Sequence, residues 1–203
     1  MPYEWGDFFD RFSVSDAQRI KLERYYELLV DWNSRINLTA LTSFVDVREY
    51  HFADSIAVAS MIDLHACSGL VDVGTGAGFP GIPLKILYPD LPIVLIEVIA
   101  KRRSFLEAVV SELNLSNIEI CPLDWRTFVH ATAYTHDIFC ARASLRPDEL
   151  CCMFSGKSRY KRAQLIYWAS QNWLPGATEK KYLRKMFAYT VGDRSRKYVF
   201  FKK

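Results

Sequence analysis

A glycine-rich segment at residues 71–81 carries the clearest chemical signal in the sequence. An apolar run leads into it, and glycine then occupies every second position, at Gly74, Gly76 and Gly78. Glycine permits unusual backbone dihedrals and lets a ligand come close to the main chain. Glu97 follows the next apolar run, 19 residues after Gly78, and an acid at that place commonly binds ribose hydroxyls in Rossmann-like sheets. The pattern predicts a binding site for a nucleoside-containing cofactor.

The same segment disfavours a dinucleotide. The fingerprint Gly-x-Gly-x-x-Gly fails because Phe79 stands where its third glycine belongs. A pyrophosphate needs backbone N–H donors at the start of the following helix, and Pro80 and Pro83 each remove one. S-adenosylmethionine carries no phosphate, and its amino and sulfonium groups are cationic, so the nearby carboxylate of Asp72 favours it. We therefore predict S-adenosylmethionine as the cofactor, with a site formed by Asp72, Gly74, Gly76, Gly78, Phe79 and Glu97.

A strand expected over residues 118–123, the third along the chain, leads directly into Asp124, Trp125 and Arg126. An acid followed by an aromatic residue at this place is suited to bind adenine, by a hydrogen bond and by stacking. Two other interpretations stay open, in which Asp124 caps a helix and Trp125 belongs to the hydrophobic core.

Apolar periodicity predicts helices before the first strand and an alternation of strands and helices after it. Ser15 and Gln18 resemble a capping box at the start of a helix that reaches Trp32, and a second helix is expected over residues 46–61. The alternation implies a mostly parallel, doubly wound α/β sheet, whose ligands bind beyond the carboxyl ends of the strands. The expected strands lie at residues 70–73, 93–97, 118–123, 137–143 and 165–169, with a helix at 101–114 and a late hairpin from 186–191 and 198–201.

Charge is unevenly distributed along the chain. The net charge is +3, but residues 1–100 hold 7 Lys and Arg against 14 Asp and Glu, whereas residues 101–203 hold 19 against 9. Such asymmetry favours a polyanionic partner, such as a nucleic acid, for the second half. A solvated basic surface explains the counts equally well.

The remaining composition disfavours several classes of protein. The five cysteines include no Cys-x-x-Cys pair and have no His at zinc-ligand spacing, so we expect reduced, buried thiols and no metal site. No run approaches the roughly 18 apolar residues of a membrane span, and the first residues lack the pattern of a signal peptide. We expect a cytoplasmic, monomeric protein without membrane attachment, built as one domain with a small extension.

Five motifs, taken in order along the chain, resemble the family of bacterial 16S rRNA (guanine-N7) methyltransferases called RsmG or GidB. The resemblance covers about residues 25–145. Its Asn-Leu-Thr and Gly-Phe-Pro-Gly-Ile-Pro stretches rarely occur together in other methyltransferases. The motifs are Trp32-Asn33-x-Arg35-Ile36-Asn37-Leu38-Thr39, His51-Phe52-x-Asp54-Ser55, the loop from Asp72 to Leu84, Lys101-Arg102-x-x-Phe105-Leu106 and Ala141-Arg142-Ala143.

The resemblance implies a Rossmann-like class I methyltransferase fold, with an N-terminal helical extension at residues 1–65 and a cofactor-binding core at residues 66–203. It also implies transfer of a methyl group from S-adenosylmethionine to N7 of one guanosine in 16S rRNA, with the RNA or the small ribosomal subunit as partner. The family's cofactor contacts correspond here to Gly74, Phe79, Glu97, Trp125, Arg126 and Arg142.

The sequence departs from the family pattern in its second half. Asp124-Trp125-Arg126 stands where the family usually has Arg-Ala-Glu, which puts Arg126 in doubt as a ligand, and Ala169-Ser170 replaces a Lys-Gly pair. Residues 144–164 align poorly and contain a basic run around Tyr160. The run is suited to bind phosphate and stack on a base, in place of the missing lysine, and it is equally consistent with a solvated loop. Its basic residues are Lys157, Arg159, Lys161 and Arg162.

Guanine N7 carries no proton, so its methylation needs no general base and depends on alignment of the base with the methyl group. Arg142, at the end of the fourth expected strand, is our candidate for positioning the base; a structural ion pair is the alternative. His51 and Asp54 share a helix face, and we expect them to hold the helical extension against the cofactor loop. Asn37 and Lys101 are candidate RNA contacts, although a turn and a solvated helix start explain them as well.

Two other functions stay open. One is a class I methyltransferase with a small-molecule or protein substrate, and the other is an RNA-binding relative that has lost methyl transfer. Dependence of the activity on RNA and on salt separates the rRNA enzyme from the first alternative. RNA binding without cofactor binding would support the second.

Overall fold

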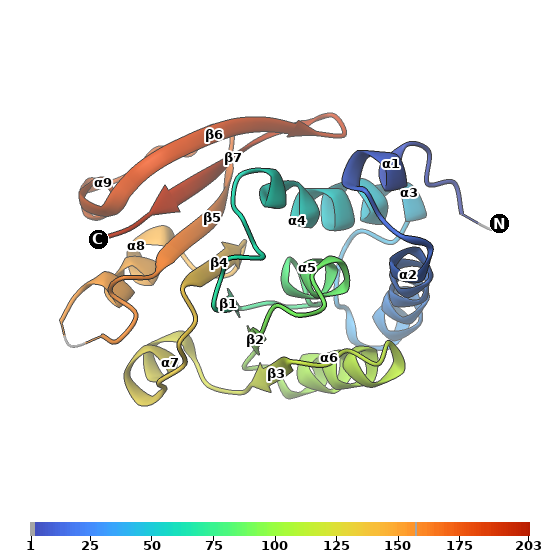
Figure 1. Ribbon diagram of the computed structural model, residues 1–203, viewed down its shortest axis with the longest axis horizontal. Helices are drawn as coiled ribbons and strands as arrows, with labels where there is room; N and C mark the ends of the chain where they lie inside the picture. The colour runs from blue at the N-terminus through green and yellow to red at the C-terminus, as the bar shows by residue number, and fades with distance from the viewer. Residues whose placement is uncertain (1–2, 157) are drawn as a thin grey trace.

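The computed structural model describes residues 3–156 and 158–203, and its centre is a seven-stranded sheet in the order β3-β2-β1-β4-β5-β7-β6 (Figure 1). Strands β1 to β5 are parallel, and β7 runs antiparallel to β5 and to β6. The chain builds β2 and β3 on one side of β1 and β4 and β5 on the other, which confirms the predicted doubly wound α/β fold. The strands are β1 (Leu70–Val73), β2 (Ile93–Ile96), β3 (Ile118–Cys121), β4 (Ile138–Arg142), β5 (Gln164–Ser170), β6 (Leu183–Val191) and β7 (Arg194–Phe201).

The predicted late hairpin is confirmed, and both of its strands are longer than expected. β6 pairs with β7 from Leu183 to Val191, and Gly192 takes a positive φ of 54° in the turn. The tip of the hairpin reaches the helices that precede β1. There Tyr50 donates a hydrogen bond to Asp193, and the guanidinium of Arg194 lies 3.7 Å from the centre of the Tyr50 ring.

Helices cover both faces of the sheet because successive residues of a strand point to opposite sides. Leu70 and Cys140 belong to a core cluster shared with the helices at the N-terminus and those after β1 and β2, whereas Val71 and Cys121 belong to a second cluster on the other face. Figure 1 shows the two groups of helices on either side of the sheet. The helices after β1 are α5 (Gly81–Leu87), α6 (Ala100–Glu112), α7 (Trp125–Ala131), α8 (Pro147–Leu150), the 3-10 turn η3 (Cys151–Phe154) and α9 (Ala177–Tyr182).

The N-terminal helices pack on the same face of the sheet as α5 and α6. They are α1 (Phe8–Phe12), α2 (Asp16–Ile36), α3 (Phe44–Val47), the π-helical η1 (Arg48–Ala53), α4 (Asp54–Ile56) and the 3-10 turn η2 (Ala57–Ser60). The capping box of Ser15 and Gln18 starts α2 as predicted, and the helix continues past Trp32 to Ile36. The second expected helix consists of four short successive pieces. Over the residues that the structure describes, we find no helix with both the length and the apolar character to cross a membrane.

The boundary predicted between residues 65 and 66 falls between η2 and β1, in a segment without helix or strand. One hydrophobic cluster continues across it, with Leu22 and Phe52 on one side and Leu70 on the other, all fully buried. Packing therefore joins the two parts, and their division into an extension and a core stays a prediction.

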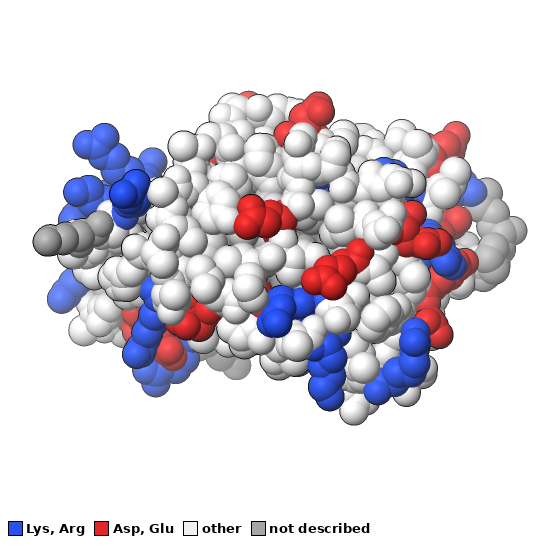
Figure 2. Space-filling model, turned by 90° about the horizontal axis from the view of Figure 1, so that it is seen from below, with Lys and Arg blue, Asp and Glu red and all other residues white. Residues whose placement is uncertain are grey.

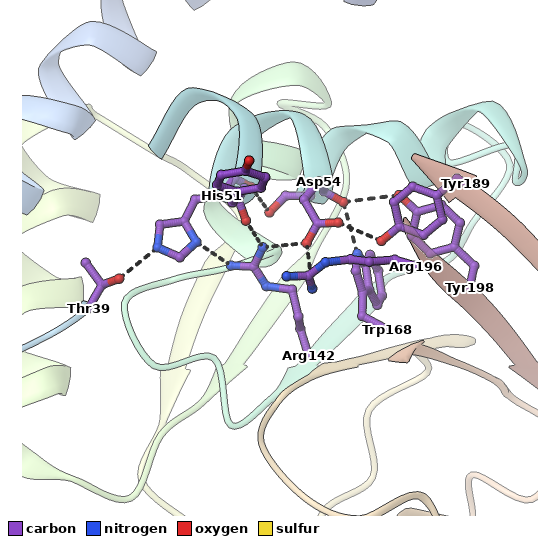
Figure 3. A network of polar contacts seen from close by, with 10 residues as sticks. Thr39, His51, Asp54, Arg142, Trp168, Tyr189, Arg196 and Tyr198 are labelled. Atoms are coloured by element: carbon purple, nitrogen blue, oxygen red, sulfur yellow. Dashed lines mark hydrogen bonds and ion pairs between the residues drawn. The ribbon is translucent and has the colours of Figure 1, made fainter. Parts of the chain in front are cut away.

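Asp54, at the start of α4, has a fully buried carboxylate whose partners join three parts of the fold (Figure 3). Its Oδ2 lies 3.0 Å from Nη1 of Arg142 at the end of β4 and 3.5 Å from Nη1 of Arg196 on β7. Its Oδ1 accepts a hydrogen bond from Tyr189 on β6 at 2.6 Å, and its backbone carbonyl accepts two more from side chains of β5 and β7. Asp54 thus holds the helical segment against β4, β5 and the hairpin, whereas the prediction placed its contact at the cofactor loop.

Asp72 lies fully buried beneath the glycine-rich loop. Its Oδ2 accepts hydrogen bonds from the hydroxyl of Thr75 at 2.6 Å and from the N–H of Gly81 at 2.8 Å. Its Oδ1 has no hydrogen-bond partner among the described residues. Burial away from water raises the pKa of Asp72 to about 6, although the two hydrogen bonds and the charge of Arg142 act in the opposite direction.

Replacement of Asp54 tests whether its ion pair supports the fold. We expect Asp54→Asn to lower the free energy of unfolding by about 3–5 kcal/mol, because the nearly buried guanidinium of Arg142 loses its anionic partner. Urea denaturation followed by circular dichroism measures the change. The matched control is Asp31→Asn, which breaks the exposed pair with Arg35 and should cost about 1 kcal/mol or less. Equal losses in the two variants would contradict the assignment.

Replacement of Asp72 tests the burial of its carboxyl group. The folded state retains the proton of Asp72 up to a pH of about 6, above its ordinary pKa of 3.8, so this residue's contribution to stability falls as the pH rises through that window. Asp72→Asn lacks this dependence. We expect the variant to gain roughly 3 kcal/mol relative to the unmodified protein between pH 4 and pH 7, measured by urea denaturation at each pH. A stability difference that does not change with pH would refute the assignment.

Candidate functional site

A cavity of about 610 Å³ opens at the carboxyl ends of β1, β2 and β4. Its walls come from the glycine-rich loop, the residues after β2, the start of α7 and the end of β4, and η1 and β7 contribute from one side. Doubly wound sheets bind ligands at this place, because the chain continues from β1 and from its neighbour β4 toward opposite edges of the sheet and leaves a crevice between the two connections. The predicted site residues that line the cavity are Gly74, Gly76, Phe79, Glu97, Asp124, Trp125, Arg126 and Arg142.

The loop after β1 comes very close to the end of β4. Gly74 has a φ of 66°, and a Cβ added to it would lie 2.5 Å from the Cβ of Ser144, so a larger residue does not fit there. Gly78 does not line the cavity, because it packs inward: an added Cβ would lie 2.7 Å from the hydroxyl of Tyr25. Asp72 also lies behind the loop. These two predicted cofactor residues therefore shape the wall of the site from its far side.

Glu97 links the residues after β2 to the glycine-rich loop. Its side chain is almost fully buried, with Oε2 accepting a hydrogen bond from the N–H of Gly76 at 3.1 Å and Oε1 accepting one from the N–H of Ile99 at 2.8 Å. Arg102 forms an ion pair with it at 3.7 Å. An ionised carboxylate offers about four acceptor positions, so Glu97 can accept further hydrogen bonds from hydroxyl groups in the cavity.

His51 connects η1 to the cofactor loop, as predicted. Its ring stacks on the ring of Phe79, with centroids 4.5 Å apart and an angle of 17° between the planes. Nδ1 lies 3.2 Å from Arg142 and Nε2 lies 2.9 Å from the hydroxyl of Thr39. Because arginine only donates, Nδ1 accepts and Nε2 carries the proton. Burial, followed by the charge of Arg142, lowers the pKa of His51 to about 3, so the ring is neutral at neutral pH.

Arg142 takes part in a structural ion pair and also lines the cavity (Figure 3). Its Nη1 donates to the Asp54 carboxylate and to the backbone carbonyl of Tyr50, both at 3.0 Å, and its guanidinium lies 5.2 Å from the centre of the Phe79 ring. The alternative interpretation of Arg142 as an ion-pair residue is therefore confirmed. Its predicted action on the substrate base stays a prediction.

Asp124 is the N-cap of α7. Its Oδ1 accepts hydrogen bonds from the N–H groups of Arg126 and Thr127 at 3.0 Å, and its Oδ2 accepts one from the Thr127 hydroxyl at 2.7 Å. The hydroxyl and amide of Thr127 hold the pKa of Asp124 below its ordinary value. Trp125 is buried against Phe128 and Phe139. The cap and core interpretations are thus confirmed, and both residues still present atoms to the cavity.

The predicted RNA contacts do not form a single cluster around the cavity. Asn37 ends α2 with a positive φ of 50°, in agreement with its role in a turn. Lys101 is exposed in the first turn of α6, one residue before Arg102 on the cavity wall. Neither of these two residues lines the cavity.

The basic run lies in the loop between η3 and β5. Arg159, Lys161 and Arg162 are exposed, and Figure 2 shows Lys and Arg side chains gathering at the end of the molecule where this loop projects. Tyr160 is buried and stacks on Phe128, with ring centroids 5.7 Å apart. Stacking of Tyr160 on a base is therefore a wrong prediction, because the ring fills the core. Lys157 lies outside the described residues.

Two basic residues of the cavity were not predicted from the sequence. Arg102 lines the wall beside Glu97, and Arg196 reaches it from β7. Arg102 belongs to the Lys-Arg motif, which was a usable signal, whereas nothing in the local sequence around Arg196 indicated that the hairpin returns to the site. The described residues contain no group of His, Cys, Asp and Glu side chains arranged to hold a metal ion.

Known proteins that resemble this chain point to one family. The model of the GidB family, described as rRNA small subunit methyltransferase G, matches residues 18–172. The ribosomal RNA small subunit methyltransferase G of Macrococcus caseolyticus is 41% identical over 152 residues, which covers 69% of this chain and 60% of that protein. The protein of the same name from Bacillus subtilis is 39% identical over 144 residues, which covers 68% of this chain and 60% of that protein. The chain thus spans about 60% of the length of these relatives.

Solved structures with a similar fold are more distant in sequence. Magnesium protoporphyrin IX methyltransferase (ChlM) from Synechocystis PCC 6803, with bound SAM, has a TM-score of 0.57 at 16% identity, over 93% of this chain and 98% of that chain. A mutant of MtNAS in complex with S-adenosylmethionine has a TM-score of 0.61 at 13% identity, over 94% of this chain and 77% of that chain. These likenesses concern the fold, which is that of a Rossmann-like class I methyltransferase. Since the family model matches most of its length, the chain belongs to the rRNA small subunit methyltransferase G (GidB) family.

Proposed function

We propose that the protein transfers a methyl group from S-adenosylmethionine to N7 of a guanosine in 16S rRNA, either in the RNA alone or in the small ribosomal subunit. Because this substrate belongs to the ribosome, we place the reaction in the cytoplasm. The observation that carries the proposal is the cavity at the carboxyl ends of β1, β2 and β4, where the Glu97 carboxylate meets the Gly76 amide, in a chain of this family.

The residues around the cavity fit S-adenosylmethionine, which supplies an electrophilic methyl group when bound. Glu97 has acceptor capacity for the ribose hydroxyls. A Cβ added to Gly76 would meet nothing within 4 Å, so the main chain there is open to a ligand. Val98 and Ile99 are 57% and 40% exposed on the cavity wall and offer apolar surface to adenine. The carboxylates of Glu97 and Asp72 favour the cationic end of the molecule.

The chemistry of N7 agrees with the side chains present. Guanine N7 is a hydrogen-bond acceptor with a free lone pair, so no proton has to leave it. His51, the histidine on the cavity wall, is neutral, and both of its ring nitrogens are already engaged by Arg142 and Thr39. The protein then accelerates methyl transfer by orienting the guanine and by excluding water from the site. These are the main contributions to the rate when the reaction needs no general acid or general base.

Exposed basic residues support RNA as the substrate. Lys101 lies next to the cavity wall, and Arg159, Lys161 and Arg162 project from the loop before β5. Contacts of this kind bind phosphates without regard to sequence, and they weaken as salt displaces them. Affinity for RNA would then come from this basic surface, and the choice of base from the cavity itself.

Methyl transfer can be tested directly. We expect the protein, incubated with radiolabelled S-adenosylmethionine and small subunits that lack the modification, to place label on a single guanosine as 7-methylguanine. Because phosphate contacts carry the affinity, raising the salt from 50 to 200 mM should lower kcat/KM by about tenfold or more. Nuclease digestion and mass spectrometry locate the label. Label on a small molecule or a protein, or cofactor binding without any transfer, would overturn the proposal.

Glu97 provides a separate test of the cofactor site. We expect Glu97→Gln to raise the Kd for S-adenosylmethionine by about tenfold or more, a loss of at least about 1.4 kcal/mol, because an amide cannot accept all the hydrogen bonds that the carboxylate accepts. Isothermal titration calorimetry measures the Kd. The control is Glu107→Gln, an exposed residue on α6, which should bind the cofactor as the unmodified protein does. Unchanged affinity in Glu97→Gln would rule out this site.

A further inference from the structure

A second hollow, of about 550 Å³, lies directly beside the cofactor cavity. The two share one wall, formed by Ala143, Ser144 and Leu145 after β4. The rest of the lining of the second hollow comes from β5, the segment after it, and the contacting helices α8 and α9. Figure 1 shows where these elements lie in the fold. The two hollows therefore adjoin along these three residues, and a group bound in the second one lies next to the cofactor cavity.

Glu179 on α9 places a carboxylate in this hollow. Its side chain is buried, with 9% of the residue exposed. Within residues 3–156 and 158–203, no hydrogen bond or ion pair engages it. Gly176 leaves room for the carboxylate, because a Cβ added there would lie 2.8 Å from Oε2. Neither of its carboxylate oxygens is among the buried side-chain atoms without a partner. The side chain therefore packs into the wall while its unpaired oxygens stay open to the hollow, where they can accept hydrogen bonds from a ligand.

The other acidic and basic side chains of the hollow are already paired with one another. Arg146 lies 2.8 Å from the carboxylate of Asp148 and 3.4 Å from that of Glu149. The guanidinium of Arg146 therefore forms ion pairs with those two carboxylates and none with Glu179. Glu179 is thus the charged side chain of this hollow that has no partner within the described residues.

Two aromatic side chains also line the hollow, together with the shared residues 143–145. The half-buried rings of Tyr167 on β5 and Trp173 after it both line it, with centroids 6.1 Å apart and planes at 51°. Aromatic faces of this kind stack on nucleobases whatever the sequence. On the shared wall itself, the hydroxyl of Ser144 is buried without a hydrogen-bond partner in the described chain.

We propose that this second hollow receives the guanine base to be methylated and that the carboxylate of Glu179 binds its Watson–Crick edge. The inference rests on the proposed methyl transfer to a guanosine. Guanine presents two donors on that edge, N1–H and the N2 amino group, and an ionised carboxylate only accepts. N7 lies on the other edge of the ring and is left free to face the cofactor cavity.

The same contact selects against adenine. Adenine has an acceptor at N1, no amino group at C2, and its one amino group at C6. A carboxylate placed to bind N1–H and the N2 amino group of guanine would therefore meet the N1 lone pair of adenine and lose both of those hydrogen bonds. Sites built to bind a polar group reject analogues that lack it, because a buried partner is left unpaired. Glu179 would thus determine specificity without taking part in methyl transfer, and its removal would affect kcat/KM for RNA while leaving cofactor affinity intact.

Inosine at the target position tests the contact on the unmodified protein. Inosine lacks the N2 amino group and keeps N7, so it removes one of the two donors that Glu179 would bind. Small subunits assembled with inosine in place of the target guanosine should show kcat/KM lowered by about 10- to 100-fold. Methylation of inosine and guanosine at equal rates would overturn the inference while leaving the proposed function standing. Absence of label on any guanosine would instead refute the proposed function and, with it, this inference.

A variant then shows whether Glu179 is the residue responsible. We expect Glu179→Gln to lower kcat/KM with guanosine by about tenfold or more, and to reduce the penalty for inosine to about threefold or less, because the amide no longer binds both donors. The Kd for S-adenosylmethionine should stay within about twofold, which shows that the variant is folded. Glu107→Gln, on the surface of α6, is the matched control. An inosine penalty as large in Glu179→Gln as in the unmodified protein would exclude Glu179 as the reader of the base.

Discussion

The buried carboxylate of Asp54 is the interaction on which the rest of the structure depends. It lies at the start of a short helix, yet its partners come from β4 and from the terminal hairpin. A buried carboxylate is costly unless it is fully paired, so the helical segment, the centre of the sheet and the hairpin have to assemble together. Arg142, held in this way, forms one side of the cavity, and the walls of the site are therefore set by the same contacts that close the fold.

The cofactor loop is fixed from behind by a second buried acid. Asp72 accepts hydrogen bonds from Thr75 and Gly81 at the two ends of the loop, and Glu97 holds the amide of Gly76 from the neighbouring strand. Two carboxylates therefore establish the loop's shape and place negative charge beside it. That charge suits a cationic cofactor and is unsuited to a pyrophosphate, in agreement with Pro80 and Pro83, which remove amide donors from the end of the loop and the start of α5.

The chain after β4 borders two hollows, to which we assign the cofactor and the substrate base of the proposed reaction. Residues 143–145 line both the cofactor cavity and the aromatic hollow of Tyr167 and Trp173. Residues 144–164 match the family motifs poorly. Part of that segment, from Ser144 to Asp148, lines the hollow where we infer that the substrate base binds.

The sequence by itself determined the doubly wound sheet, the capping box at Ser15, the glycine-rich loop and the acid at Glu97, because each depends on spacing between residues near one another in the chain. Tertiary structure decided which of these residues reach the cavity. Asp72 and Gly78 belong to the loop motif and yet face the core, and Tyr160 sits within a basic run and yet fills the interior. Arg196 and Glu179 gave no local signal, because their positions depend on how the hairpin and α9 pack against distant strands. Burial and long-range pairing are properties of the assembled fold, and no local pattern in the chain encodes them.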